Sequence, residues 1–114
     1  MSVIYNEKII ALFIFSFFLS SAYAGNQAGK VSWIVVHASY GLIYFGIDGS
    51  LASGKPHCAS SSYWMIRDEN SNVGKQQYSM LLSAHASGKT IEAIGMNTCI
   101  PWANGEDVNS ITIK

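Results

Sequence analysis

The chain has 114 residues, of which 49% are hydrophobic and only 12% are charged. Seven Lys and Arg residues balance seven Asp and Glu residues, so the formal charge at pH 7 is zero. This length allows one domain. The balanced charge argues against a nucleic acid or an anionic membrane as partner, because both require a surplus of basic side chains. The apolar content is too high for a disordered chain.

The first 24 residues show the three parts of a secretory signal peptide. Lys8 and the amino group form a weakly positive start, Ile9–Leu19 is an uncharged apolar run, and Ala22 and Ala24 are the small residues that signal peptidase requires. A membrane anchor needs about 20 apolar residues, and this run is shorter. The pattern predicts cleavage after Ala24 and a mature domain of residues 25–114. It also predicts no membrane span after cleavage, and a secreted or periplasmic location.

Cys58 and Cys99 are the two cysteines of the chain. In an oxidising compartment, two cysteines in a small domain form a disulfide, and closing a loop of roughly 40 residues would stabilise the fold by about 4 kcal/mol. A metal site would have to use these cysteines with His57 and His85, but no pair has zinc-finger spacing. A redox pair would require a C-x-x-C spacing. The sequence therefore predicts a structural disulfide, and neither a metal nor another cofactor.

Three β-rich segments open the mature domain. Lys30–Ala38 is rich in β-branched and aromatic residues, and Leu42–Ile47 is similar and ends at the turn dipeptide Asp48-Gly49. Ser50–His57 contains Gly, Ser and Pro and is predicted to be a loop. A short third strand is expected at Tyr63–Arg67.

The periodicity becomes helical after a polar turn, Asp68–Gly74. The spacing i, i+3, i+4 and i+7 predicts one helical face made of Tyr78, Leu81, Leu82 and His85. Gly88 is suited to end this helix, because φ can be positive there. Two further strands, Thr90–Met96 and Val108–Lys114, are expected on either side of a loop at Asn97–Asp107.

The resulting order is β-β-β-α-β-β, which is the element order of the OB-fold, a five-stranded Greek-key barrel. We expect a mainly β domain of this type with one helix, pinned by one disulfide. An open α+β sheet with the helix on one face is the alternative, because periodicity does not reveal the order of strands in a sheet.

No motif predicts an enzyme. Gly88-Lys89-Thr90 resembles the end of a P-loop, but Ser83 replaces the earlier glycine and a helix precedes the motif. No serine lies in a G-x-S-x-G sequence, and a barrel of this size offers no deep cleft to exclude water. We therefore expect no catalytic residue, and we interpret His37 and His85 as hydrogen-bonded core or rim residues.

The candidate ligand-binding residues are aromatic side chains and their polar neighbours. The strand aromatics assigned to the core are Trp33, Tyr44, Phe45 and Tyr63. Tyr63 and Trp64 are adjacent, so one of them must face outward or into a neighbouring chain. A flat aromatic face beside directional polar groups is suited to sugars. For Trp102, which lies in the loop at Asn97–Asp107, the alternative role is a lid over the disulfide. The candidates are Tyr40, Ser60, Trp64, Trp102, Asn104 and Glu106.

The pattern over Gly29–Ile113 resembles the B subunits of A-plus-five-B bacterial toxins, especially the subtilase-cytotoxin type, and related small exported proteins. It consists of KVSWIVVH, LIYFGIDG, Pro56-His57-Cys58 before YWMI, YSMLLSAHASGK running into TIEAIGM, and a C-terminal cysteine loop. The resemblance implies an OB-fold protomer, a homo-oligomer that is a ring pentamer, and binding to host glycans. Ala28-Gly29-Lys30 stands where such subunits carry a sugar-contacting serine, so no binding residue is transferred.

These observations favour an exported, non-enzymatic binding module for a glycan or a protein. The alternative is an envelope or secreted structural protein, or an inhibitor that binds another protein.

Overall fold

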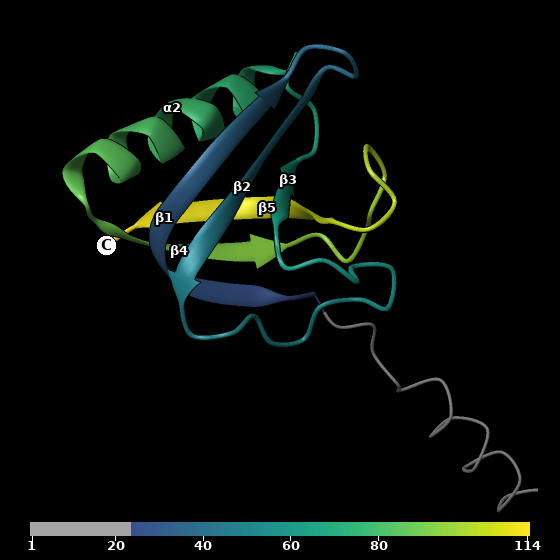
Figure 1. The fold of residues 1–114 in the computed structure, drawn as a ribbon, viewed down its shortest axis with the longest axis horizontal. Helices are drawn as coiled ribbons and strands as arrows, with labels where there is room; N and C mark the ends of the chain where they lie inside the picture. Colours follow the sequence, from purple (N-terminus) through teal and green to yellow (C-terminus); the bar gives the residue numbers. More distant parts are fainter. Residues whose placement is uncertain (1–23) are drawn as a thin grey trace, which may run out of the picture.

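The computed structural model describes residues 24–114, so the predicted signal segment, apart from Ala24, lies outside the described residues. The elements follow the predicted order (Figure 1). They are β1 (Asn26–His37), β2 (Leu42–Gly49), β3 (Trp64–Ile66), α2 (Asn72–Ser87), β4 (Thr90–Gly95) and β5 (Glu106–Ile113). Two strands start earlier than predicted, β1 at Asn26 and β5 at Glu106.

The five strands close into a barrel in the order β1-β2-β3-β5-β4, with β4 pairing back onto β1. Neighbouring strands are antiparallel except β3 and β5, which are parallel. This arrangement confirms the predicted OB-like barrel, and the alternative of an open α+β sheet is wrong. Closure also pairs the strand edges that an open sheet would leave free.

β1 takes part in both sides of the closure. Its first residues, Asn26–Lys30, pair with β4, and its later part pairs with β2. A β-bulge lies between Val31 and Trp33, where the strand curves around the barrel (Figure 1). Gly29 lies close to this bend, and a Cβ there would be 1.8 Å from the carbonyl oxygen of Asp48. The close approach of the two strands therefore requires glycine at this position.

The helix α2 packs against β1, β3 and β5. The side chain of Ser71 accepts a hydrogen bond from the Gly74 N–H at 2.9 Å and caps the first turn. Gly88 ends the helix in the left-handed conformation, as predicted. The start at Asn72 lies inside the segment predicted to be a turn, because Ser71 supplies a cap that the apolar periodicity does not reveal. Within residues 24–114, this helix lacks the length and apolar character needed to cross a membrane.

The buried face of α2 is rotated from the predicted one. Gln77, Leu81 and Ala84 are buried, whereas Leu82 is 45% exposed. The Gln77 side chain donates a hydrogen bond to the carbonyl oxygen of Asn109 at 3.0 Å, so a polar residue holds the inner side of the helix. An apolar pattern cannot detect an inward glutamine, and this explains the error.

The core fills the inside of the barrel and the space under α2. Its fully buried members come from β2, β3, α2, β4 and β5: Phe45, Trp64, Ile66, Leu81, Ile91, Ala93 and Val108. None of these core residues lies in the turn between β1 and β2 or in the loop between β4 and β5, so both connections lie at the surface of the barrel.

Candidate functional site

An open pocket lies between the β1–β2 turn and the β4–β5 loop. Its volume is about 320 Å³, and its lining consists of Tyr40, Leu42, Pro101, Trp102 and Ala103. None of these lining residues is charged. OB-folds bind oligonucleotides and oligosaccharides at these two loops and at the adjoining strand face. The pocket therefore occupies the position at which this architecture binds ligands.

Aromatic side chains continue from the pocket across the outer face of β2. We call this set the aromatic surface, and it comprises Trp33, His37, Tyr40, Tyr44, Tyr63 and Trp102. The ring centroids of Tyr40 and Trp102 are 5.7 Å apart in an edge-to-face arrangement, and those of Tyr40 and His37 are 5.2 Å apart and stacked. Tyr44 connects this group to the rest, with its centroid 6.0 Å from Trp102. The rings therefore support one another over a continuous area.

The rings of the aromatic surface lie close against the backbone of the barrel. A Cβ on Gly46 would be 2.3 Å from the indole nitrogen of Trp33, and a Cβ on Gly105 would be 2.6 Å from the ring of Tyr63. Exposure is greatest at the pocket end, where Tyr40 is 70% exposed. The arrangement consequently presents ring faces and edges at the surface while their other sides rest on the strands.

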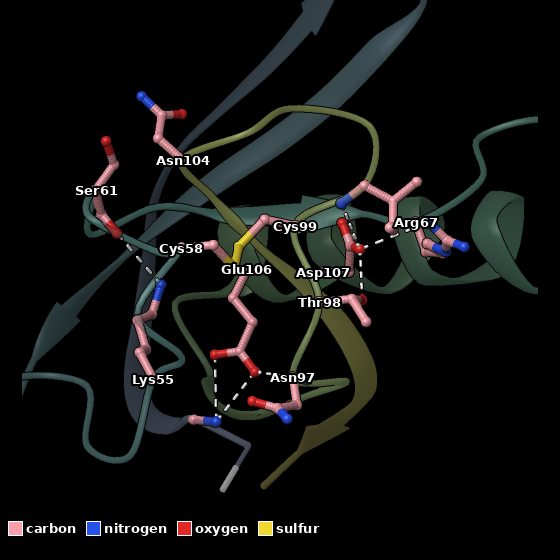
Figure 2. The surroundings of a disulfide bond; sticks show 12 residues. Lys55, Cys58, Ser61, Arg67, Asn97, Thr98, Cys99, Asn104, Glu106 and Asp107 are labelled. Atoms are coloured by element: carbon pink, nitrogen blue, oxygen red, sulfur yellow. Dashed lines mark hydrogen bonds and ion pairs between the residues drawn. A yellow bond between two sulfur atoms is a disulfide. The ribbon is translucent and has the colours of Figure 1, made fainter. Parts of the chain in front are cut away.

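The disulfide fixes the loop that carries the tryptophan of the pocket. Cys58 and Cys99 are bonded, with their Cα atoms 6.2 Å apart, which confirms the predicted pairing (Figure 2). The bond ties the β4–β5 loop to the long loop between β2 and β3. It thus limits the movement of the segment that leads into Pro101 and Trp102.

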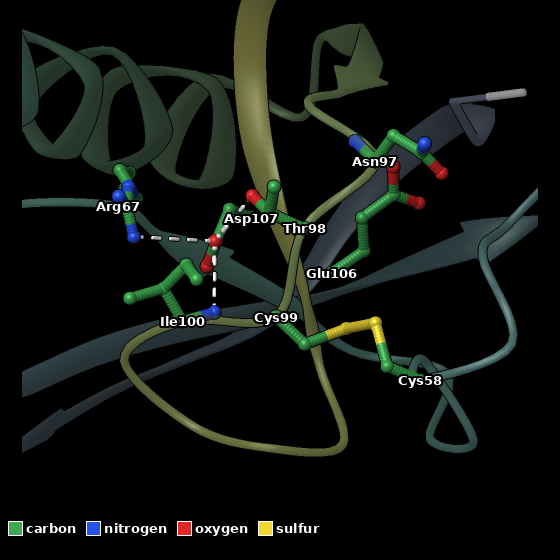
Figure 3. A network of polar contacts seen from close by, with 8 residues as sticks. All are labelled: Cys58, Arg67, Asn97, Thr98, Cys99, Ile100, Glu106 and Asp107. Carbon is green, nitrogen blue, oxygen red and sulfur yellow. Dashed lines mark hydrogen bonds and ion pairs between the residues drawn. A yellow bond between two sulfur atoms is a disulfide. The ribbon is translucent and has the colours of Figure 1, made fainter. Parts of the chain in front are cut away.

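A buried carboxylate holds the same loop from the other side (Figure 3). Oδ2 of the fully buried Asp107 accepts hydrogen bonds from the Ile100 N–H at 3.0 Å and the Thr98 hydroxyl at 2.7 Å. It also lies 3.7 Å from the guanidinium group of Arg67. These contacts stop one residue short of Pro101, so they position the start of the pocket lining.

The structure brings four of the six candidate residues to one region. Tyr40 and Trp102 line the pocket together. The side chain of Asn104 accepts a hydrogen bond from the hydroxyl of Tyr63. Ser60 is exposed next to this loop, because the residue after it donates its N–H to the Asn104 carbonyl oxygen at 3.0 Å. Trp102 packs against three rings of the aromatic surface, those of His37, Tyr40 and Tyr44. A lid over the disulfide is the alternative role that the sequence leaves open for it.

The prediction that Trp64 is a ligand-binding residue is wrong. Its side chain is fully buried, and its indole N–H donates a hydrogen bond to Oε1 of Gln27 at 2.8 Å. Alternation requires one of two neighbouring residues to face outward, and that residue is Tyr63.

The prediction that Glu106 is a ligand-binding loop residue is also wrong. It is the first residue of β5, is fully buried and points the same way as the core residue Val108. Its carboxylate accepts hydrogen bonds from the backbone N–H groups of Gly25 and Asn97. An external ligand has no access to it.

Sequence reasoning missed four members of the site, which are Trp33, His37, Tyr44 and Tyr63. Tyr44 lies between the buried residues Ile43 and Phe45, and strict alternation along β2 would have placed it outside. Trp33 follows a β-bulge, and the extra residue changes which face it occupies.

The arrangement is suited to non-covalent recognition. Its lining offers ring surfaces and backbone groups, and residues 24–114 contain no group of three or more His, Cys, Asp and Glu side chains placed to hold a metal ion. No protein-family model, curated protein or solved structure matches this chain. The functional argument therefore depends on the geometry of the pocket and the aromatic surface.

Proposed function

We propose that the chain is the precursor of an exported, non-enzymatic binding module that binds carbohydrate at the pocket and the aromatic surface. The observation that carries this proposal is the uncharged pocket between Tyr40 and Trp102, at the two loops where OB-folds bind oligosaccharides. The C–H face of a sugar ring packs on an aromatic face, while nearby polar groups bind its hydroxyls. The disulfide supports folding in an oxidising compartment, which agrees with the predicted signal peptide.

The charge of the site favours a sugar over a single-stranded nucleic acid. Base stacking on OB-fold aromatics accompanies a basic groove that follows the phosphates. The pocket lining contains neither Lys nor Arg. Hydrogen-bonding groups that suit hydroxyls lie nearby, at Asn104 and Ser60.

The experiment that tests this function is binding of the exported, processed protein to an array of immobilised oligosaccharides, followed by titration of the best one. We expect Trp102→Ala to weaken binding at least tenfold, about 1.4 kcal/mol, because it removes one wall of the pocket. Leu82→Ala is the matched control, since Leu82 is exposed on α2 and away from the pocket lining. Its affinity should equal that of the wild type.

Three outcomes would contradict the proposal: no oligosaccharide retained, equal weakening by Trp102→Ala and Leu82→Ala, or displacement of the sugar by a single-stranded oligonucleotide. Capture of one protein partner that sugars do not compete for would instead support the structural or inhibitor alternative. In that case the same surface would be a protein interface.

The proposal extends to several copies acting together. A homo-oligomer is implied by the resemblance to toxin B subunits, and a ring of five would turn weak single sites into strong attachment to a glycan-coated surface. Native mass spectrometry of the processed protein measures the number of copies. A monomeric particle at micromolar concentration would remove this extension and leave the single-site proposal standing.

A further inference from the structure

Glu106 is a buried carboxylate with no cation in contact. Its Oε1 and Oε2 lie 3.2 and 3.0 Å from the backbone nitrogen of Gly25, and Oε2 also accepts the Asn97 N–H at 3.0 Å (Figure 2). Within residues 24–114, no Lys, Arg or His nitrogen comes within 4.0 Å of it. A buried charge is costly unless an opposite charge joins its hydrogen bonds. A cation in direct contact with the Glu106 carboxylate would therefore stabilise the fold.

The surroundings of Glu106 are shaped for a backbone nitrogen. A Cβ on Gly25 would be 2.4 Å from Oε1, and a Cβ on Gly95 would be 1.8 Å from Oε2. The two residues also bond to each other, since the Gly95 N–H donates to the Gly25 carbonyl oxygen at 2.8 Å. Backbone without side chains thus lines the carboxylate, and the hydrogen bond from Gly95 holds Gly25 next to it.

We infer that Glu106 is the receptor for the α-ammonium group that removal of the signal peptide creates on Gly25. Hydrolysis of the Ala24–Gly25 bond by a signal peptidase consumes one water and leaves a carboxylate on Ala24 and an ammonium group on Gly25. The nitrogen that donates one N–H to Glu106 in the precursor becomes a charged donor with three. This inference rests on the predicted cleavage after Ala24 and not on carbohydrate binding.

Lys55 is the other cation near this carboxylate, and it is engaged elsewhere. Its ammonium group donates to the carbonyl oxygen of Tyr63 at 3.1 Å and lies 4.1 Å from the ring centroid of Trp64. Burial lowers the pKa of Lys55 to about 8, and the Glu106 carboxylate partly offsets that lowering. Lys55 therefore acts on Glu106 from a distance, and the position in direct contact is the one that Gly25 occupies.

The order of events follows from burial. Gly25 is buried in the closed barrel, so a peptidase must cut before the start of β1 pairs with β4 and Gly25 reaches Glu106. The new ammonium group then completes the barrel as it folds. Processing and folding are thereby coupled, and the mature chain is more stable than one in which Gly25 remains in a peptide bond.

The first test is titration of the Gly25 α-amino group in the exported, processed protein, by competitive acetylation read out by mass spectrometry. An ordinary α-amino group has a pKa of about 8. Direct contact with the Glu106 carboxylate should raise this pKa, because attraction at hydrogen-bond distance outweighs the lowering that burial causes. Acetylation at pH 8 should be at least tenfold slower than in the same protein unfolded in urea. An ordinary pKa with fast acetylation would overturn the inference.

The second test compares thermal unfolding of the processed wild type with a version that carries one Ser inserted between Ala24 and Gly25. The insertion moves the charge away and returns the Gly25 nitrogen to a peptide bond. We expect it to lower the melting temperature by several degrees in the wild type, and hardly at all in a Glu106→Gln background. Equal losses in both backgrounds would overturn the inference; if Glu106→Gln does not fold, the titration decides alone.

The mass of the native processed protein separates this inference from the proposed function. A first residue other than Gly25 would overturn the inference while leaving sugar binding untouched. Loss of sugar binding with Gly25 at the N-terminus would do the reverse.

Discussion

Trp64 and Trp102 are the same kind of side chain in two different regions of one barrel. Trp64 begins β3, is fully buried, and has its indole N–H bonded to Gln27. Trp102 is only partly buried in the β4–β5 loop, against Tyr40 and beside the open pocket. The contacts of the interior indole come from the fold itself, whereas the outer indole borders an open pocket, where we propose that a ligand binds. Substitutions at the two positions should therefore separate stability from the proposed recognition.

The largest effect is expected from Trp64→Ala. Removing this side chain leaves a cavity in the interior and should lower the free energy of unfolding by about 3–5 kcal/mol. Trp64→Phe keeps most of the volume but orphans Oε1 of Gln27, at a cost of about 1–3 kcal/mol. Urea denaturation measures both. Leu51→Ala, at a side chain that is 91% exposed, is the surface control, and we expect it to change the free energy of unfolding by less than about 0.5 kcal/mol. If Trp64→Ala lowers the free energy of unfolding no more than the control does, Trp64 does not stabilise the interior as proposed.

The next effect is expected at the disulfide, which joins the two regions. Replacing Cys58 and Cys99 by serine removes a link across 41 residues and should reduce the free energy of unfolding by about 2–4 kcal/mol. Because the link also restrains the loop before Trp102, oligosaccharide affinity should fall as well. Reduction of the wild type with dithiothreitol should reproduce both losses. An unchanged affinity in the double variant would mean that the disulfide serves stability alone.

A smaller effect is expected from Asp107→Asn, which sharpens the comparison at the pocket side. The amide keeps one acceptor for Ile100 and Thr98 but loses the charge, so about 1–3 kcal/mol of stability should be lost and the loop loosened. Arg67→Ala is the comparison variant: its side chain is 42% exposed, but its removal leaves the fully buried Asp107 carboxylate without its cation. We expect a smaller loss than in Asp107→Asn, because the hydrogen bonds from Ile100 and Thr98 remain. If both variants lose the same free energy of unfolding, Asp107 stabilises the protein through its ion pair with Arg67 and not through the hydrogen bonds from the loop.

The sequence predicted the interior of this molecule better than its surface. The element order and the helix end at Gly88 follow from residue patterns within single segments. The Cys58–Cys99 bond follows from the presence of two cysteines in a domain predicted to be exported to an oxidising compartment. The position of Glu106 depends on barrel closure, because its buried carboxylate is bonded to Gly25 and Asn97, which precede β1 and follow β4. The outward direction of Trp33 depends on a bulge that no apolar period records. Two of the six candidate residues, Trp64 and Glu106, lie in the interior, and four members of the aromatic surface were not among the candidates.

The smallest effect is a pH dependence that originates at Lys55, whose ammonium group lies over the buried Trp64 ring. Burial lowers the pKa of Lys55 from 10.5 to about 8 in the folded protein. Between these two values the unfolded chain binds more protons than the folded one, so the free energy of unfolding should rise as the pH rises. A rise of about 1 kcal/mol is expected once solvent screening is allowed for.

The Gly25 ammonium group, paired with Glu106, would contribute the opposite slope, so the informative quantity is the difference in the free energy of unfolding between the wild type and Lys55→Met. That difference should change from pH 7.5 to pH 10 in urea denaturation, whereas Lys75→Met, altered at an exposed position on α2, should track the wild type. Parallel curves for Lys55→Met and the wild type would mean that Lys55 is solvated like a surface lysine and that the interior around Trp64 is open to water on that side.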